Sequence, residues 1–494
     1  MSESTVHPEP AAGEQVGGSL KARVIRGGLW VAALKGTSRG LGFVRTLILA
    51  RLLMPKDFGI LGIALLAIGA INTFTETGFS AALVQKKEDI EEYLDTCWTI
   101  QAIRGFVLAA ILFFAAPLVA RFFESPASGP VLQVLAISVA LSGLQSARTV
   151  YYQRELLFDR QFAQDVVSTV ADLAVSVTLA LAWRNVWALV YGSLAGSAVG
   201  LIASYLLQPQ RPRLRVDPKA AADLWRFGRW VLGSSALVFL VTNLDNAVVG
   251  KLLGESALGL YAMAYTISNL PATEITQVFN RVAFPAFARM QQDLPRIRAA
   301  YFYAFRYMAA LVLPSGVFLA LMAPDLVRVV LGDKWMQAVP ALRVLAVYGI
   351  VRAVASANGP LVLGLGRPDV DTKIMVIKLL GMGSIIYPLV LSDGIRGVAI
   401  AVLAPVILSQ TYGFTMAARL LRCGTASWLQ AAAPAALVAL LLGAALFGVS
   451  HALGPLSHAL CLLSAAGLTG LAITSSVWWG LRHRFAQSFP GGVA

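Results

Sequence analysis

Charged side chains are scarce in this sequence. Only 13% of its 494 residues are Asp, Glu, Lys or Arg, whereas about a quarter is usual for a soluble globular domain. Apolar residues make up 57% of the chain and the mean hydropathy is +0.70. Between residues 24 and 482, apolar stretches of about 20 residues follow one another without a connection long enough for a soluble domain. This composition excludes a soluble globular protein and indicates a chain that crosses a membrane many times.

Cysteine and histidine are also few, and both are scattered. The cysteines are Cys97, Cys423 and Cys461, and the histidines are His7, His451, His458 and His483. Neither set has the spacing of a disulfide framework or of a metal site, so we expect no metal and no cofactor. Residues 1–23 lack the apolar core of a signal peptide and are predicted to be a disordered cytoplasmic tail.

Acidic residues are outnumbered by basic ones, 26 against 40, which gives a net charge of +14. Such an excess can indicate a nucleic-acid partner, but in membrane proteins basic residues collect in cytoplasmic loops. If the N-terminus is inside, the cytoplasmic connections carry about three times as many Lys and Arg residues as the outward ones. We therefore predict a membrane protein with both termini in the cytoplasm and no nucleic-acid partner.

The apolar stretches predict an all-α membrane protein with about 14 transmembrane helices, since strand alternation is absent. An internal repeat with an offset of 200 residues aligns Arg26–Ala64 with Arg226–Ala264, and Gly59 with Gly259. Six predicted spans separate the two copies, so both insert in the same direction and their symmetry axis runs along the membrane normal. The predicted division is an N-lobe at 24–208, a basic cytoplasmic linker at 209–224, a C-lobe at 225–422, two further helices within 423–482, and a tail at 483–494.

Several cations nevertheless fall inside predicted spans. The deepest are Lys35, Arg39, Arg45, Arg104 and Arg352. Each charge near the bilayer centre costs about 2.5–3.5 kcal/mol, so these side chains must face water or one another. On the first helix, Lys35 and Arg39 lie about 40° apart and Arg45 about 80° to the other side, which predicts one cationic face on a cavity. Gly36 and Gly40 beside that face predict close approach of a neighbouring helix.

Arginines close to the ends of spans have a simpler interpretation. Arg51, Arg281 and Arg343 are predicted to extend toward the membrane surface or to form structural ion pairs.

Four acidic residues also lie within spans and are candidates for gating or ion coupling. They are Glu76, Asp172, Asp245 and Glu274. Asp245 stands 200 residues after Arg45, so the repeat places an anion in one lobe where the other has a cation. Three interpretations remain open for Asp245: a salt bridge between lobes that breaks during transport, a proton or sodium site, or a static pair with another helix. Asp172 and Glu274 are equally undecided.

Two six-helix lobes around a positive interior predict an alternating-access transporter with an anionic cargo. Arginine suits bidentate recognition of phosphate, and a pyrophosphate group would satisfy several of these cations together.

Short motifs connect the chain to a known family. The stretch RLLMPKDFG at Arg51–Gly59 resembles the sequence that follows the first helix in Wzx-type polysaccharide transporters of the multidrug/oligosaccharidyl-lipid/polysaccharide exporter superfamily. ETGFSAALVQ at Glu76–Gln85 and LGLGRP at Leu363–Pro368 are similar to further stretches of that family. The resemblance covers roughly residues 24–422 and implies the superfamily fold, which multidrug exporters of the MATE type share.

The resemblance also implies a function. Such proteins flip an undecaprenyl-pyrophosphate-linked oligosaccharide across the bacterial inner membrane for exopolysaccharide, capsule or O-antigen synthesis. On this basis Lys35, Arg39 and Arg45 are expected to contact the head group, with Arg104 and Arg352 as weaker candidates. Proton or sodium coupling is expected without assignment to a residue. The implied partners are the lipid-linked oligosaccharide, membrane lipids and polysaccharide polymerase or assembly proteins.

Other functions remain as alternatives at this stage. One is a multidrug/cation antiporter of the same superfamily, for which an acid-dominated cavity would be usual. Another is a flippase for lipid-linked peptidoglycan precursors, which also uses a cationic cavity. A membrane enzyme is not expected, because the longest outward connection, about 322–339, has no cluster of His, Asp or Glu suited to catalysis.

Overall fold

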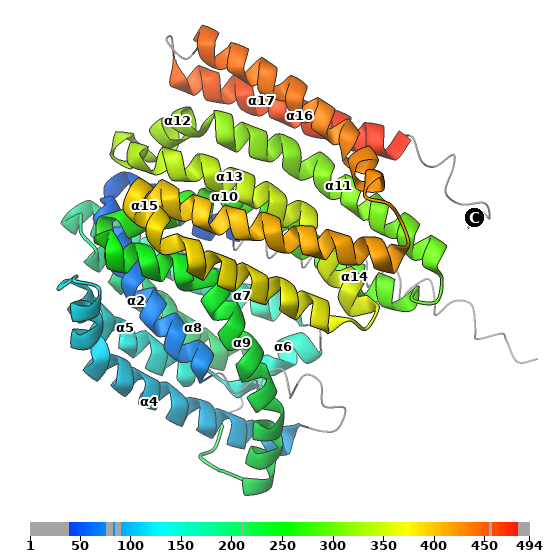
Figure 1. Ribbon diagram of the computed structural model, residues 1–494. Helices are drawn as coiled ribbons and strands as arrows, with labels where there is room; N and C mark the ends of the chain where they lie inside the picture. Colours follow the sequence, from blue (N-terminus) through cyan, green and yellow to red (C-terminus); the bar gives the residue numbers. More distant parts are fainter. Residues whose placement is uncertain are drawn as a thin grey trace, which may run out of the picture.

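The computed structural model describes residues 39–75, 83, 90–155, 157–208, 212–453 and 457–482. All regular structure within these ranges is helical. Ten of the described helices are long and apolar enough to cross a membrane. Figure 1 shows them as a bundle in which the earlier helices (blue to cyan) form one group and the later ones (green to red) another. The predicted all-helical, multi-spanning fold is confirmed.

The N-lobe begins with a helix at residues 39–52, which we call the first helix. It continues through α2 (Pro55–Phe74), α4 (Glu91–Phe122), α5 (Ser128–Gly143), the short η1 (Ala147–Thr149) and α6 (Val150–Arg154), α7 (Phe158–Trp183) and α8 (Trp187–Leu207). Glycines allow close packing within the lobe. Gly105 of α4 meets Gly143 of α5, and Gly192 and Gly196 of α8 lie against Asp172 of α7.

The C-lobe consists of α9 (Pro218–Leu252), α10 (Gly254–Arg289), α11 (Leu294–Leu321), α13 (Val339–Ala355), α14 (Asn358–Gly364) and α15 (Pro368–Leu421). The short α12 (Ala323–Leu326), η2 (Val327–Leu331) and η3 (Asp333–Ala338) connect α11 to α13. Non-helical backbone at Asp393 and Gly394 divides α15 into two legs. Each leg is long enough to span a bilayer.

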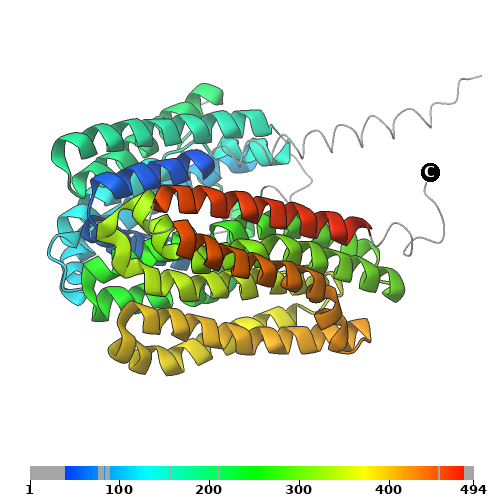
Figure 2. The same cartoon turned by 90° about the horizontal axis from the view of Figure 1, so that it is seen from above.

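The last two helices, α16 (Ala426–Leu453) and α17 (His458–Arg482), form a pair along α11 at the margin of the bundle (Figures 1 and 2). The His458 ring contacts the Asp325 carboxylate at 2.5 Å and holds the start of α17 on α12. This pair therefore lies on the outer side of the C-lobe.

The linker between the lobes is shorter than predicted. Helix α9 already begins at Pro218, inside the segment 209–224 expected to be a linker, because proline is well tolerated in the first turn of a helix. The backbone N–H groups of Arg213, Arg215 and Asp217 donate hydrogen bonds to the side chains of Asp95, Thr99 and Thr96, respectively. The described part of the linker is thus held on α4.

Helices α13 and α14 are separated at Ser356 and Ala357.

The two lobes meet where α2 crosses α10. A Cβ atom at Gly59 would overlap the carbonyl of Glu255, and a Cβ atom at Gly259 would overlap the carbonyl of Pro55. Both pairs are related by the offset of 200 residues, so each lobe presents the same position to the other, as a two-fold axis requires. The repeat in the sequence therefore corresponds to a pseudo-symmetric contact. In contrast, Gly40 faces open space, so the close approach predicted there is wrong at Gly40, and Gly36 lies outside the described residues.

We expect that the variant Gly59→Ala is destabilised, because the added methyl group must push two helix backbones apart. Overpacking of this kind costs about 1–3 kcal/mol or more. The thermal unfolding midpoint of the purified protein in detergent measures the effect. Gly383→Ala is the matched control, since Gly383 lies within a leg of α15 and faces open space. Equal midpoints for the two variants would contradict the contact.

Candidate functional site

Ion pairs join the lobes at one end of the bundle, where α2 begins and α9 ends; we call this the closed end. Lys56 of α2 contacts Glu255 of α10 at 3.0 Å, and the Ser125 hydroxyl also donates to Glu255. Lys251 of α9 contacts Glu124 at 2.7 Å, and this ammonium lowers the pKa of the Glu124 carboxyl. These contacts connect the ends of α2, α4, α9 and α10 across the lobe boundary.

The stretch Arg51–Gly59 contributes a second set of contacts at the closed end. The Arg51 guanidinium donates to the carbonyls of Val329 and Val330 in η2. The Trp335 indole N–H of η3 donates to the carbonyl of Ala50 at 2.9 Å, and its ring packs edge-on against Phe58. Arg51 therefore has the structural role predicted for a span-end arginine, although its partners are carbonyl groups. The side chain of Arg281 lies outside the described part of the structure, and Arg343 is exposed.

One ion pair crosses between the lobes away from the closed end. Arg39 of the first helix contacts Glu274 of α10, and both side chains are 42% exposed. Arg39 lies 15 residues before Met54, hence roughly 22 Å along the helix axis from the closed end. This pair thus combines a cation and an acid that the sequence had assigned to different roles, one to substrate binding and one to coupling. Lys35 lies outside the described residues.

Arg45 faces a different neighbour. Its guanidinium contacts the Asp172 carboxylate of α7 at 2.8 Å, and the two side chains are only 16% and 21% exposed. Arg39 and Arg45 are about 120° apart around the helix, which directs them to different lobes. The prediction of one shared cationic face is therefore corrected. Arg45 and Asp172 form a pair inside the N-lobe.

Arg104 lines a cavity of about 340 Å³ between α2, α4, α5 and α8. Hydroxyl groups of Ser138, Ser142, Ser193 and Ser197 contribute to its wall. The Arg104 guanidinium donates to the Asn72 carbonyl at 2.9 Å and to the Thr75 hydroxyl at 3.0 Å. Arg104 therefore faces the interior of the N-lobe. Glu76, the next residue after Thr75, lies outside the described residues.

Asp245 is buried within the C-lobe at 3% exposure. Its carboxylate accepts a hydrogen bond of 2.8 Å from the Tyr261 hydroxyl of α10. Lys378 of α15 is close enough to interact electrostatically with Asp245. In this state none of the described ion pairs joins Asp245 to the N-lobe. Its neighbours belong to its own lobe.

Arg352 of α13 lies close to the inter-lobe ion pair. Its guanidinium donates to the Thr273 hydroxyl at 2.6 Å, and Thr273 directly precedes Glu274 on α10. Consecutive residues of α10 therefore bind Arg39 of one lobe and Arg352 of the other. We call the group of Arg39, Glu274, Thr273 and Arg352 the inter-lobe site.

A row of three tyrosines connects the neighbourhood of this site with Asp245. Arg352 lies 5.9 Å from the ring centroid of Tyr348. Tyr348 is 6.0 Å from Tyr265, which is 6.4 Å from Tyr261, the hydrogen-bond donor to Asp245. Sequence reasoning missed this row. Its only signal was a pair of tyrosines at i and i+4 in an apolar helix, and Tyr348 could be added only from the tertiary structure.

The two lobes carry related charges with opposite sign. In the N-lobe, Arg45 of the first helix pairs with Asp172 of α7. In the C-lobe, Asp245 of α9 interacts with Lys378 of α15. Arg45 and Asp245 are 200 residues apart. The same offset takes Asp172 to position 372 on α15, and Lys378 lies less than two helical turns after that position. In each lobe, the charged residue at this position of the repeat therefore has an oppositely charged residue on another helix of the same lobe.

Comparison with known proteins shows the family. The family described as "Polysaccharide biosynthesis protein" matches residues 48–340, more than half of the chain, and the chain belongs to it. This chain is 27% identical over 362 residues to the lipopolysaccharide biosynthesis protein WzxC of Escherichia coli K12, and the match covers 73% of this chain and 74% of that protein. It is 26% identical over 342 residues to the succinoglycan biosynthesis transport protein ExoT of Rhizobium meliloti, covering 68% of each.

A solved structure of the lipid II flippase MurJ in an inward closed conformation has the same fold. The TM-score is 0.75, and the match covers 92% of this chain and 100% of that one at 13% identity. At this identity the likeness shows the fold alone. Together with the ten helices long and apolar enough to span a membrane, it confirms the predicted fold of a multi-pass membrane protein.

We expect that Asp172→Asn lowers the thermal unfolding midpoint, because it leaves the poorly exposed Arg45 without its counter-charge. Breaking a buried pair costs up to about 3–5 kcal/mol, and the partial exposure of this pair reduces that figure. The double variant Arg45→Gln, Asp172→Asn should recover part of the loss. Asp369→Asn, which breaks a surface pair with Arg367, should have little effect. A double variant no more stable than Asp172→Asn would argue against the pairing.

Proposed function

We propose that this protein flips an undecaprenyl-pyrophosphate-linked oligosaccharide across the bacterial inner membrane for the synthesis of a surface polysaccharide. The inter-lobe ion pair of Arg39 and Glu274 carries the proposal. Both side chains are half-exposed at a depth where charge facing lipid is costly. A wet space between the lobes accounts for them. Family membership and relatives named for polysaccharide biosynthesis and transport support the choice of cargo.

The proposed mechanism is alternating access, with the closed end at the periplasmic surface. The bias of Lys and Arg toward the other end supports this orientation and cytoplasmic termini. While the periplasmic end is closed, the head group reaches the inter-lobe site from the cytoplasm. Transport then requires the contacts of Lys56 with Glu255 and of Lys251 with Glu124 to break while the opposite end closes. Exposed ion pairs are weak enough to be exchanged in this way.

Glu274 acts as an internal counter-ion at the inter-lobe site. Without cargo, its carboxylate neutralises Arg39. The phosphate groups of the cargo would replace this carboxylate at Arg39. Arg352, which donates to the Thr273 hydroxyl one residue before Glu274, would supply a second cationic contact. Because the lipid tail is apolar, it remains in the bilayer while the sugars and phosphates pass between the lobes.

The C-lobe group of Asp245, Tyr261 and Lys378 is the candidate for ion coupling. Asp245 is buried and already has a cation nearby, which leaves a proton as the simpler coupling ion than sodium. Glu76 remains a coupling candidate from the sequence, and Lys35 remains a candidate contact of the head group. Asp172 is assigned instead to the static pair with Arg45. The protein is proposed to catalyse no covalent reaction and to work beside a polysaccharide polymerase and assembly proteins.

We predict that Arg39→Gln and Arg352→Gln each reduce polymer output about tenfold in cells that depend on this protein. Loss of one charge-assisted hydrogen bond accounts for this factor. Membrane levels, measured by immunoblot, should stay normal. Arg396→Gln is the control, because Arg396 is an exposed residue paired with Asp393 far from the inter-lobe site. Wild-type output from both site variants would reject the assignment.

A second prediction concerns the closed end. Lys251→Cys together with Glu124→Cys, in a chain whose three native cysteines are replaced, should be joined by a short bis-maleimide because the two native side chains touch. The linked protein should lose transport in vesicles, whereas each single-cysteine variant treated alike should retain it. Full transport by the linked protein would show that this end does not need to open.

A further inference from the structure

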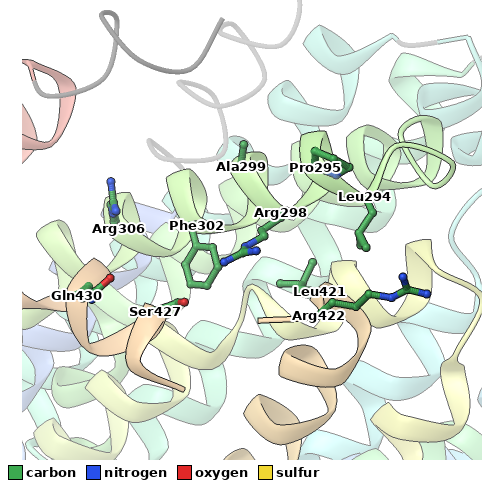
Figure 3. Close-up of a pocket in the computed structure, with 10 residues that line it drawn as sticks. All are labelled: Leu294, Pro295, Arg298, Ala299, Phe302, Arg306, Leu421, Arg422, Ser427 and Gln430. Carbon is green, nitrogen blue, oxygen red and sulfur yellow. The ribbon is translucent and has the colours of Figure 1, made fainter. Parts of the chain in front are cut away.

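A basic pocket lies in the C-lobe at the end of the bundle opposite the closed end. It has a volume of about 470 Å³ and is formed by the start of α11, the end of α15 and the start of α16 (Figure 3). Its arginines are Arg298, Arg306 and Arg422. No acidic side chain is among the residues that line it, and neither Arg298 nor Arg422 forms an ion pair with another described residue.

Aromatic side chains pack against one another beside the pocket. Phe302 and Trp428 are buried and pack with ring centroids 5.2 Å apart. The Trp428 indole N–H donates to the Tyr301 hydroxyl at 3.1 Å. Figure 3 shows Arg298 extending from α11 alongside Phe302, with Ser427 and Gln430 on the facing segment. Arg298 therefore lies on a packed aromatic surface with polar groups opposite.

The position of the pocket indicates which kind of ligand it meets. Helix α11 starts at Leu294, α15 ends at Leu421 and α16 starts at Ala426, so the pocket is at the level of a membrane surface. The exposed leucines Leu437 and Leu440 follow Gln430 along α16 by two to three turns, in the direction of the bilayer. A ligand with an anionic head and apolar chains fits this combination.

We propose that this pocket binds the phosphate group of an anionic phospholipid in the cytoplasmic leaflet. Arg298 is the central ligand of the phosphate, Arg306 and Arg422 add positive charge at the two sides of the pocket (Figure 3), and the acyl chains lie along the leucines of α16. Basic pockets between transmembrane helices on the cytoplasmic side are suited to such head groups. The pocket is separate from the inter-lobe site, which lies on the first helix, α10 and α13. The inference therefore does not depend on the proposed cargo.

Native mass spectrometry of the full-length protein in detergent tests the proposal with dioleoyl phosphatidylglycerol as the probe. The double variant Arg298→Gln, Arg422→Gln should bind this lipid about 25-fold more weakly, because each basic residue near the surface contributes roughly fivefold. Phosphatidylethanolamine should bind equally to variant and wild type.

The chain offers a close control. Arg184, like Arg422, follows a helix in the left-handed conformation, with φ of 51° against 49°, and Arg296 lies on α11 outside the pocket lining. Arg184→Gln, Arg296→Gln therefore removes the same charge and should keep full lipid binding. Equal lipid affinity in the pocket variant and the control would overturn the proposal. Displacement of the lipid by millimolar inorganic phosphate would also overturn the proposal, since the site would then be a binding site for free phosphate rather than for a lipid. Size-exclusion profiles establish that both variants are folded.

Discussion

The backbone contact between α2 and α10 at Gly59 and Gly259 positions the other features described above. It brings the lobes together at the closed end, and the surrounding contacts of Lys56, Lys251 and Trp335 reinforce that end. Helices that touch there can diverge toward the opposite surface without losing their shared axis. The polar residues between the lobes can then meet water rather than lipid, which makes charge at that depth tolerable.

The charges within the bundle fall into two kinds that differ in exposure. Arg45 with Asp172, and Asp245 with its hydrogen-bond donor Tyr261, are enclosed within single lobes. They hold helices together and would be costly to separate. Arg39 and Glu274 cross the lobe boundary and remain half-exposed. Such a pair can be broken at low cost, which is the property needed where an anionic head group must replace a carboxylate.

The stretch Arg51–Gly59 is the sequence motif that resembles Wzx-type polysaccharide transporters. The structure gives that stretch a physical role, because Arg51, Phe58 and Gly59 all contact the C-lobe. The offset of 200 residues also predicted the pairing of Gly59 with Gly259 as equivalent positions. It did not predict that they touch, since equivalent positions meet only if they lie on the symmetry axis.

Composition and periodicity were sufficient for the helical membrane fold, the repeat and the need to shelter the intramembrane cations, because these follow from the cost of polar groups in lipid. The partner of each cation depended on tertiary structure. Arg39 and Arg45 are six residues apart on one helix, yet one binds α10 and the other α7. Helix geometry gives the angle between two side chains, but which neighbour stands at that angle is decided only when the lobes pack.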